Sequence, residues 1–256
     1  MPTGPRWRYL GASVAGTSHL QRNIPCQDSQ EWKMIGENTV VIAVADGAGS
    51  AERAEEGSRT AALTATGFVA DRLRAAQPDR AEAWNGLLQE TLKEARSALE
   101  QLAGADLKPV ATTLLLAIAT PEWFATAQLG DGGIVGEFRF DELRVFSQPG
   151  NTEYINETVF LTSPGFLAHA HCTVSAAEEL TGIALFSDGL QLLAMQYTDN
   201  TAHKPFFAPV FEFASRPGST VAELAEFLRS ERVCERTDDD KTLSIAVRGD
   251  LPRPER

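Results

Sequence analysis

The chain has 256 residues, of which 43% are hydrophobic and 23% charged, and its formal net charge is -12. This composition is globular, so we expect a single folded domain over residues 1–256, with a frayed tail at about 251–256. The negative charge and the absence of clustered lysine and arginine argue against a nucleic-acid or membrane-surface partner.

The N-terminal residues and the cysteines favour a cytoplasmic protein. Residues 1–16 lack the charged and apolar regions of a signal peptide, and the apolar runs at 40–45 and 114–119 are too short to span a membrane. The three cysteines, Cys26, Cys172 and Cys234, are odd in number and widely scattered. That pattern predicts reduced thiols rather than a disulfide framework or a zinc site.

The first half of the chain predicts strands followed by a helical hairpin. Short apolar runs predict strands at 8–14, 31–35 and 40–45. Apolar residues then recur at helical spacing over 54–73 and 81–102, with Pro78 between the two segments. The segment 16–26, between the first two strands, is predicted to be a loop.

The second half of the chain predicts an antiparallel meander and then a mixture of elements. The meander strands are expected at 111–119, 123–129, 134–140 and 143–146. Beyond them we expect a strand at 182–186, a helical stretch from about Leu190, a helix at 220–232 capped by Ser219, and a strand at 242–247.

The sequence does not decide whether the aromatic segment 206–213 forms a strand or a flap. Packing of this segment in the core is the simpler interpretation. Strands and helices occur in separate blocks along the chain. This arrangement predicts an α+β fold rather than an alternating parallel sheet.

Acidic residues follow or precede apolar strands at four places. A single Asp-Gly is ordinarily a turn, because Gly adopts positive φ and Asp bonds to its own backbone. Several carboxylates on rigid strand ends, however, can converge on one point, where they repel each other unless cations neutralise them. Oxygen ligands without nearby His or Cys favour Mg²⁺ or Mn²⁺, so a turn and a metal site are both open here. The positions are Asp46-Gly47, Asp131-Gly132, Asp188-Gly189 and Asp238 to Asp240.

Competing catalytic signatures are incomplete. The pair His171-Cys172 is similar to a cysteine-phosphatase loop, but the required Arg six residues after the Cys is Glu178. The run GDGGIVG at 130–136 lacks the third glycine of a dinucleotide loop and lies between predicted antiparallel strands. The chain also has no P-loop and no G-x-S-x-G nucleophile elbow.

Six motifs stand in order across about residues 8–248: QDS (27–29), VADGAGS (44–50), ATTLLLAI (111–118), LGDGGIV (129–135), LFSDGL (185–190) and DDKTLSIAV (239–247). Together they resemble the protein phosphatase 2C family in a bacterial form. The resemblance implies a central sandwich of two antiparallel β-sheets flanked by helices, with metal ions at one end.

The resemblance assigns the metal ligands by position. Asp46 would bridge two cations, and the carbonyl of Gly47 would bind one of them. Asp188 and Asp239 would complete the shell of the first metal, so that Asp46, Asp188 and Asp239 form the catalytic set. Asp28 would support the second metal, directly or through water.

A third, weaker cation would be held by Asp131 together with Asp188. The chain departs from the family pattern at two positions. Ala48 replaces the His that many members use as a proton donor, so the general acid is unassigned. Asn23 stands where the family has a phosphate-binding Arg, and Arg22 or His19 is the candidate to replace it.

The function implied by the resemblance is hydrolysis of phosphoserine and phosphothreonine in proteins, by water activated between two divalent cations, Mn²⁺ or Mg²⁺. The partners would be a phosphoprotein substrate and a cognate Ser/Thr kinase. The missing His and Arg leave an alternative open, a catalytically silent phosphoprotein-binding regulatory module. A nuclease-like phosphoesterase is a third candidate, which the acidic surface disfavours.

Overall fold

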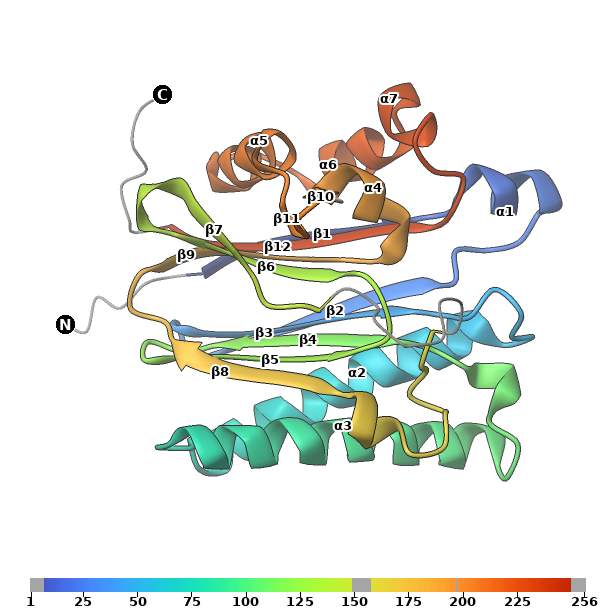
Figure 1. Cartoon of the computed structure of the whole chain (residues 1–256), viewed down its shortest axis with the longest axis horizontal. Helices are drawn as coiled ribbons and strands as arrows, with labels where there is room; N and C mark the ends of the chain where they lie inside the picture. Colours follow the sequence, from blue (N-terminus) through green and yellow to red (C-terminus); the bar gives the residue numbers. More distant parts are fainter. Residues whose placement is uncertain (1–6, 149–157, 197, 250–256) are drawn as a thin grey trace.

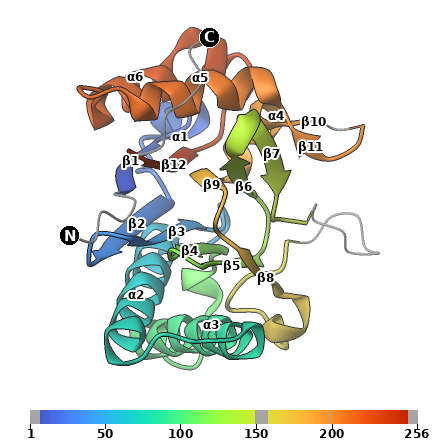
Figure 2. The ribbon, with the colours of Figure 1, turned by 90° about the vertical axis from the view of Figure 1, so that its left-hand side faces the viewer.

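The computed structural model describes residues 7–148, 158–196 and 198–249, so the expected frayed tail at 251–256 lies outside it. Two five-stranded antiparallel sheets stack face to face, and helices cover the outer face of each sheet (Figures 1 and 2). The predicted α+β sandwich is confirmed. Among the described helices, none combines the length and apolar character needed to cross a membrane.

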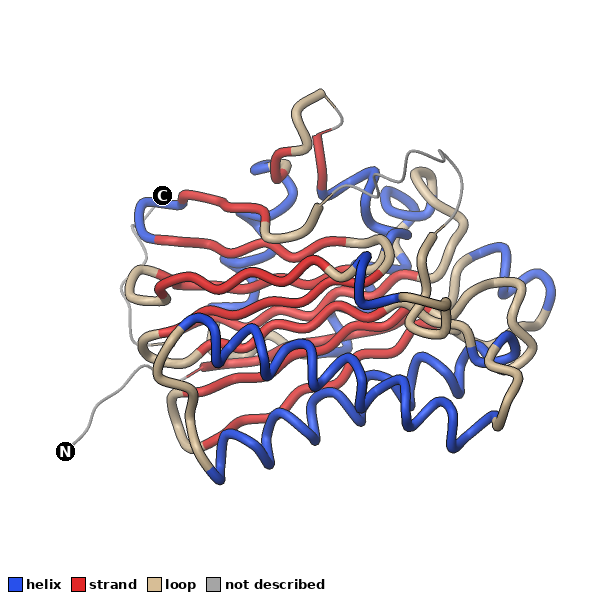
Figure 3. The backbone as a smooth tube through the Cα atoms, turned by 60° about the horizontal axis from the view of Figure 1, so that its bottom comes forward, coloured by secondary structure: helices blue, strands red, loops and turns tan. Residues whose placement is uncertain are grey.

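The first sheet carries the helical hairpin predicted from periodicity. Its strand order is β2-β3-β4-β5-β8, and every neighbouring pair is antiparallel. Figure 3 shows the two long helices, which contact each other, lying over one face of this sheet and running roughly along its strands. The elements are β2 (Asp28–Ile35), β3 (Thr39–Asp46), β4 (Leu114–Ala119), β5 (Trp123–Leu129), β8 (His171–Ala176), α2 (Ala54–Ala75) and α3 (Ala81–Ala103).

The second sheet brings the two ends of the described chain together. Its order is β1-β12-β9-β6-β7, so the first and last strands pair along their whole length. Four helices cover its outer face. The elements are β1 (Trp7–Val14), β6 (Gly133–Phe138), β7 (Glu142–Val145), β9 (Leu180–Phe186), β12 (Lys241–Arg248), α4 (Gln191–Ala194), α5 (Lys204–Ser215), α6 (Val221–Arg229) and α7 (Glu231–Cys234).

Short elements complete the described chain. The helix α1 lies at one end of the sandwich, and a two-stranded hairpin extends beside the second sheet (Figure 1). These elements are α1 (Thr17–Arg22), β10 (Met195–Gln196), β11 (Thr201–Ala202) and the 3-10 turns η1 (Lys108–Val110), η2 (Arg139–Asp141), η3 (Phe166–His169) and η4 (Asp188–Leu190).

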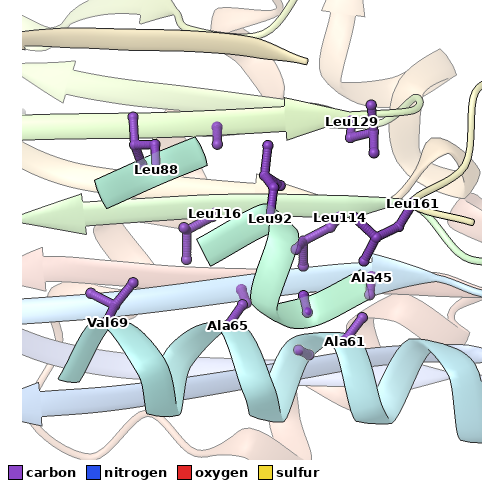
Figure 4. Packing of buried hydrophobic residues seen from close by; sticks show 14 of the residues in the cluster. Ala45, Ala61, Ala65, Val69, Leu88, Leu92, Leu114, Leu116, Leu129 and Leu161 are labelled. Atoms are coloured by element: carbon purple, nitrogen blue, oxygen red, sulfur yellow. The ribbon is translucent and has the colours of Figure 1, made fainter. Parts of the chain in front are cut away.

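Apolar side chains fill three layers, one between the sheets and one under each helical layer. Under α2 and α3, Leu88 and Leu92 pack toward Leu116 on β4, while Ala61 and Ala65 let α2 lie close to the sheet (Figure 4). Burying one leucine contributes roughly 1.5–3 kcal/mol of transfer free energy. The helical hairpin is therefore fixed to the sheet chiefly by this layer.

Two helices replace segments that the sequence left irregular. The segment 206–213 belongs to α5, whose buried positions recur at helical spacing. Pro205 lies in its first turn, where a missing N–H costs little, and this proline together with Pro209 hides the helical pattern. The predicted loop 16–26 contains α1, which has six residues, too few to show periodicity.

Several predicted boundaries are corrected by the structure. The helix predicted at 220–232 is capped by Thr220 rather than Ser219, because Thr220 and Glu223 form a reciprocal capping box. That helix stops at Arg229, and a separate turn, α7, follows. The strand expected to reach residue 140 ends at Phe138, before Phe140 adopts a φ of 64°. Similarly, β4 begins at 114 and not at 111, and β8 is a strand that the sequence did not predict.

Candidate active site

Strand ends from both sheets meet at one end of the sandwich. Asp28 begins β2 and lies directly opposite Asp46, the last residue of β3. Asp131 follows β5, Asp188 follows β9, and Asp239 precedes β12. The last four of these line a cavity of about 150 Å³, whereas Asp28 is buried beside them. The structure thus brings together all five predicted carboxylates.

Three of the carboxylates are close enough to share a cation. Oxygens of Asp46, Asp131 and Asp188 lie within 4.8 Å of one another. The backbone N–H of Asp46 donates to Thr113 Oγ1 at 2.9 Å, and Thr112 Oγ1 donates to the carbonyl of Asp46 at 2.9 Å. These bonds leave the Asp46 carboxylate at the strand end and hold its backbone still.

Asp28 and Asp131 are each oriented by a hydroxyl. Ser187 Oγ donates to Asp28 Oδ2 at 2.6 Å and accepts the backbone N–H of Thr242 at 3.0 Å. Thr158 Oγ1 donates to Asp131 Oδ2 at 2.9 Å. The other oxygen of Asp28, Oδ1, is buried without a partner among the described residues. A buried carboxylate oxygen with no donor fits a cation ligand.

Burial raises the pKa values of three carboxyls in this cluster. Burial raises the pKa of Asp28 to about 7, with Asp240 adding repulsion. The pKa of Asp188 rises to about 6 for the same reason, with Asp131 adding repulsion. The pKa of Asp46 lies well above its ordinary value, from burial and then from Asp28 and Asp188. Divalent cations would offset this repulsion, and an oxygen-only donor set suits hard ions such as Mg²⁺ and Mn²⁺.

Two glycines allow backbone segments to approach closely at the site. A Cβ at Gly189 would collide with the carbonyl oxygen of Asp240, and one at Gly47 would lie 2.5 Å from the carbonyl oxygen of Ala54. The Asp-Gly pairs at these two positions therefore serve packing as well as turning. Gly47 lines the cavity, which is where the predicted carbonyl ligand has to be.

The two acidic neighbours Asp239 and Asp240 have different environments. Asp239 is exposed at the cavity, and its carbonyl accepts from Nζ of the buried Lys241 at 3.0 Å. Asp240 is only 3% exposed and accepts the backbone N–H groups of Gly16 and Gln27 at 2.7 and 2.6 Å. The sequence did not single out Asp240. Its only signal was the acidic run directly before a strand.

The two candidate phosphate-binding residues lie in different places. His19 is buried, lines the cavity, and places Nδ1 2.9 Å from Asp240 Oδ1. Arg22 lies at the exposed end of α1, where its Nε donates to the carbonyl of Ser18 at 3.1 Å, and it does not line the cavity. Ala48 also lines the cavity.

This architecture, with carboxylates from two stacked antiparallel sheets meeting at one end and helices outside, defines a class of metal-dependent hydrolase. A profile of the family described as Protein phosphatase 2C matches residues 15–229. The chain belongs to this family of metal-dependent phosphatases, and it is an enzyme.

Known relatives agree with this assignment. Over 250 residues the chain is 30% identical to serine/threonine-protein phosphatase 3 of Escherichia coli K12, covering 94% of this chain and 98% of that protein. The fold is similar to that of the serine/threonine phosphatase Stp1 from Staphylococcus aureus, with a TM-score of 0.65, 14% identity, and coverage of 96% and 97%. The S. agalactiae serine/threonine phosphatase gives a TM-score of 0.65 at 14% identity, covering 94% of this chain and 99% of that one.

Proposed function

We propose that the protein hydrolyses phosphoserine and phosphothreonine in other proteins, using Mn²⁺ or Mg²⁺ held by its carboxylates. The observation that carries this proposal is the convergence of Asp46, Asp131 and Asp188, from both sheets, within 4.8 Å. The family match and the name of the E. coli relative support the same reaction.

The proposed roles of the ligands are those that the family resemblance implies. Asp46 would bridge two cations, with the Gly47 carbonyl beside it. Asp188 and Asp239 would hold the first cation, and the unpartnered Oδ1 of Asp28 makes it suited to support the second. Asp131, at the same cavity, would hold a third, weaker cation together with Asp188.

Bound cations would supply Lewis acidity, which lowers the pKa of water and offsets charge on the phosphoryl oxygens. The protein's contribution is to hold the ligands in place. Ser187 fixes one oxygen of Asp28, Thr158 fixes one oxygen of Asp131, and Thr112 and Thr113 hold the backbone of Asp46. Such supporting contacts typically change metal affinity or activity 10- to 100-fold when removed.

His19 is the better candidate for the phosphate contact. Among the described residues that line the cavity, it alone carries a basic nitrogen. Arg22 would have to leave its bond to Ser18 and extend inward from the exposed end of α1. Ala48 provides no proton donor at the family's histidine position, so we assign protonation of the leaving group to solvent.

The alternative of a catalytically silent binding module is not favoured, because the three carboxylates proposed as catalytic, Asp46, Asp188 and Asp239, all line the cavity. We place the substrate among phosphoproteins made by a cognate Ser/Thr kinase in the cytoplasm. The three cysteines are unpaired, in keeping with a reducing compartment.

The test is phosphate release from a phosphothreonine peptide with Mn²⁺, with Mg²⁺ and with a chelator. We expect turnover with either metal and none with the chelator. A chain that binds the phosphopeptide but releases no phosphate with any divalent cation would support the silent module instead. Equal turnover in the chelator would show that hydrolysis does not require a divalent cation.

A further inference from the structure

Asp240 lies where three separate segments of the chain meet. Its Oδ1 accepts the backbone N–H of Gly16 at 2.7 Å and lies 2.9 Å from His19 Nδ1. Its Oδ2 accepts the backbone N–H of Gln27 at 2.6 Å. Both oxygens are thus occupied by protein groups, which distinguishes Asp240 from the adjacent, exposed Asp239.

His19 lies in a short segment whose backbone Asp240 holds at both ends. It belongs to α1, a helix of six residues without a side-chain cap, which has little stability of its own. Asp240 accepts the backbone N–H groups of Gly16, directly before α1, and of Gln27, five residues after its end. The same carboxylate therefore holds the backbone of segment 16–27 at both ends and lies against the imidazole between them.

The ring geometry leaves one nitrogen of His19 for another task. Nδ1 faces Asp240, whereas Nε2 makes no hydrogen bond to any described residue. His19 lines the cavity that also contains Asp46, Asp188 and Asp239. Nε2 is thus the ring atom available to a phosphoryl oxygen at this cavity.

We propose that Asp240 is a positioning residue for catalysis, which acts through His19 by holding segment 16–27 and aiming Nε2 at the substrate phosphate. This inference rests on the proposed phosphatase function. It assigns the carboxylate after Asp239 to the substrate side of the site rather than to the metals. The prediction specific to it is energetic coupling between Asp240 and His19.

A double-mutant cycle measures this coupling. His19→Ala, Asp240→Asn and the double variant are compared with wild type by kcat/KM on a phosphothreonine peptide and by Mn²⁺ titration calorimetry. We expect each single change to lower kcat/KM about 10- to 100-fold, the range typical of outer-shell positioning groups. The double variant should be no worse than the poorer single variant, and Mn²⁺ affinity should stay within about threefold throughout. Asp238→Asn, in the same acidic run and with its side chain exposed, is the matched control and should match wild type.

Multiplying effects in the double variant, or normal kinetics in Asp240→Asn, would overturn the inference. If Asp240→Asn does not fold, His19→Asn replaces it, because the Asn amide nitrogen takes the place of Nδ1 toward Asp240 while Nε2 is lost. That variant should melt like wild type and have the kcat/KM of His19→Ala, and wild-type kcat/KM in it would overturn the inference. Metal-dependent turnover by wild type tests the proposed function separately.

Discussion

The middle of β3 and its end are built for opposite purposes. In the middle, Val41 and Ala43 lie fully buried in the apolar layer beneath α2 and α3. At the end, Asp46 faces Asp28 across the strand pair and shares a cavity with four other carboxylates, those of Asp131, Asp188, Asp239 and Asp240. Stability and chemistry are therefore separated along a single strand, with the rigid apolar part holding the reactive part in place.

The two regions also differ in the sign of their contribution to folding. Burying apolar surface stabilises the native state, whereas burying carboxylates next to one another disfavours their charged forms. The raised pKa values of Asp28, Asp46 and Asp188 record that cost. We therefore expect cations to stabilise the carboxylate end, whereas the core needs none.

The largest effect is expected from Asp46→Asn, which removes the charge that would bridge the two proposed cations. We expect kcat for phosphopeptide hydrolysis to fall by several orders of magnitude at saturating Mn²⁺, while circular dichroism shows an unchanged fold. Retention of more than about a tenth of wild-type activity would contradict a bridging role, since even outer-shell changes cost about that much.

Leu92→Ala tests the core, where we expect a loss of stability without a loss of activity. Leu92 is fully buried between α3 and the first sheet, so its truncation should lower the free energy of unfolding by about 2–5 kcal/mol. Denaturant titration measures this loss. At 25 °C the folded variant should keep wild-type kcat and Mn²⁺ affinity, and a large loss of either would show that the two regions are not separable.

Asp131→Ala tests whether the carboxylates at this end serve cations of different affinity. If Asp131 serves a weak third cation, turnover should fall about 10- to 100-fold while two tightly bound metals remain. Metal analysis after gel filtration decides the point. Loss of both tight metals would place Asp131 in the primary shell instead.

The last prediction is a pH dependence that Asp28 imparts to the metal-free protein. Its pKa is about 7 in the folded chain, against an ordinary value of about 3.9, so the folded state binds more protons between these values. This contribution to stability is present at low pH and is lost as pH rises through about 7. In chelator, wild type should lose melting temperature between about pH 4 and about pH 7 relative to Asp28→Asn, which has no such titration. Parallel curves for the two proteins would contradict the raised pKa.

Much of the fold could be predicted from the sequence because its signals are local. The helices α2 and α3 are long, and their apolar residues recur at helical spacing. Where a strand is followed by Asp-Gly, that pair marks the end of the strand. The helix α5 contains two prolines, α1 is short, and β8 is only half-buried, so the local patterns there are weak. Tertiary packing determines the secondary structure of those three segments, and packing between distant segments cannot be read from a local sequence pattern.

The candidate site shows the same division. Convergence of the carboxylates followed from the resemblance of six motifs, and the structure places them together, although their roles as ligands stay predictions. The distinction between Asp239 and Asp240 could not be predicted. It depends on the hydrogen bonds of Asp240 with Gly16 and Gln27, which lie 224 and 213 positions earlier in the chain, respectively. The choice between Arg22 and His19 likewise depends on how α1 is held.

The most direct test of the central claim is the thermal unfolding of wild type and Asp46→Asn as Mn²⁺ is added. A cation that binds only the folded carboxylate cluster should stabilise wild type progressively, by about 2.7 kcal/mol at a concentration of about 100 times Kd. Asp46→Asn should need far more Mn²⁺ for the same shift. A wild-type melting curve that does not change at millimolar Mn²⁺ would contradict a formed cation site at this end of the sandwich.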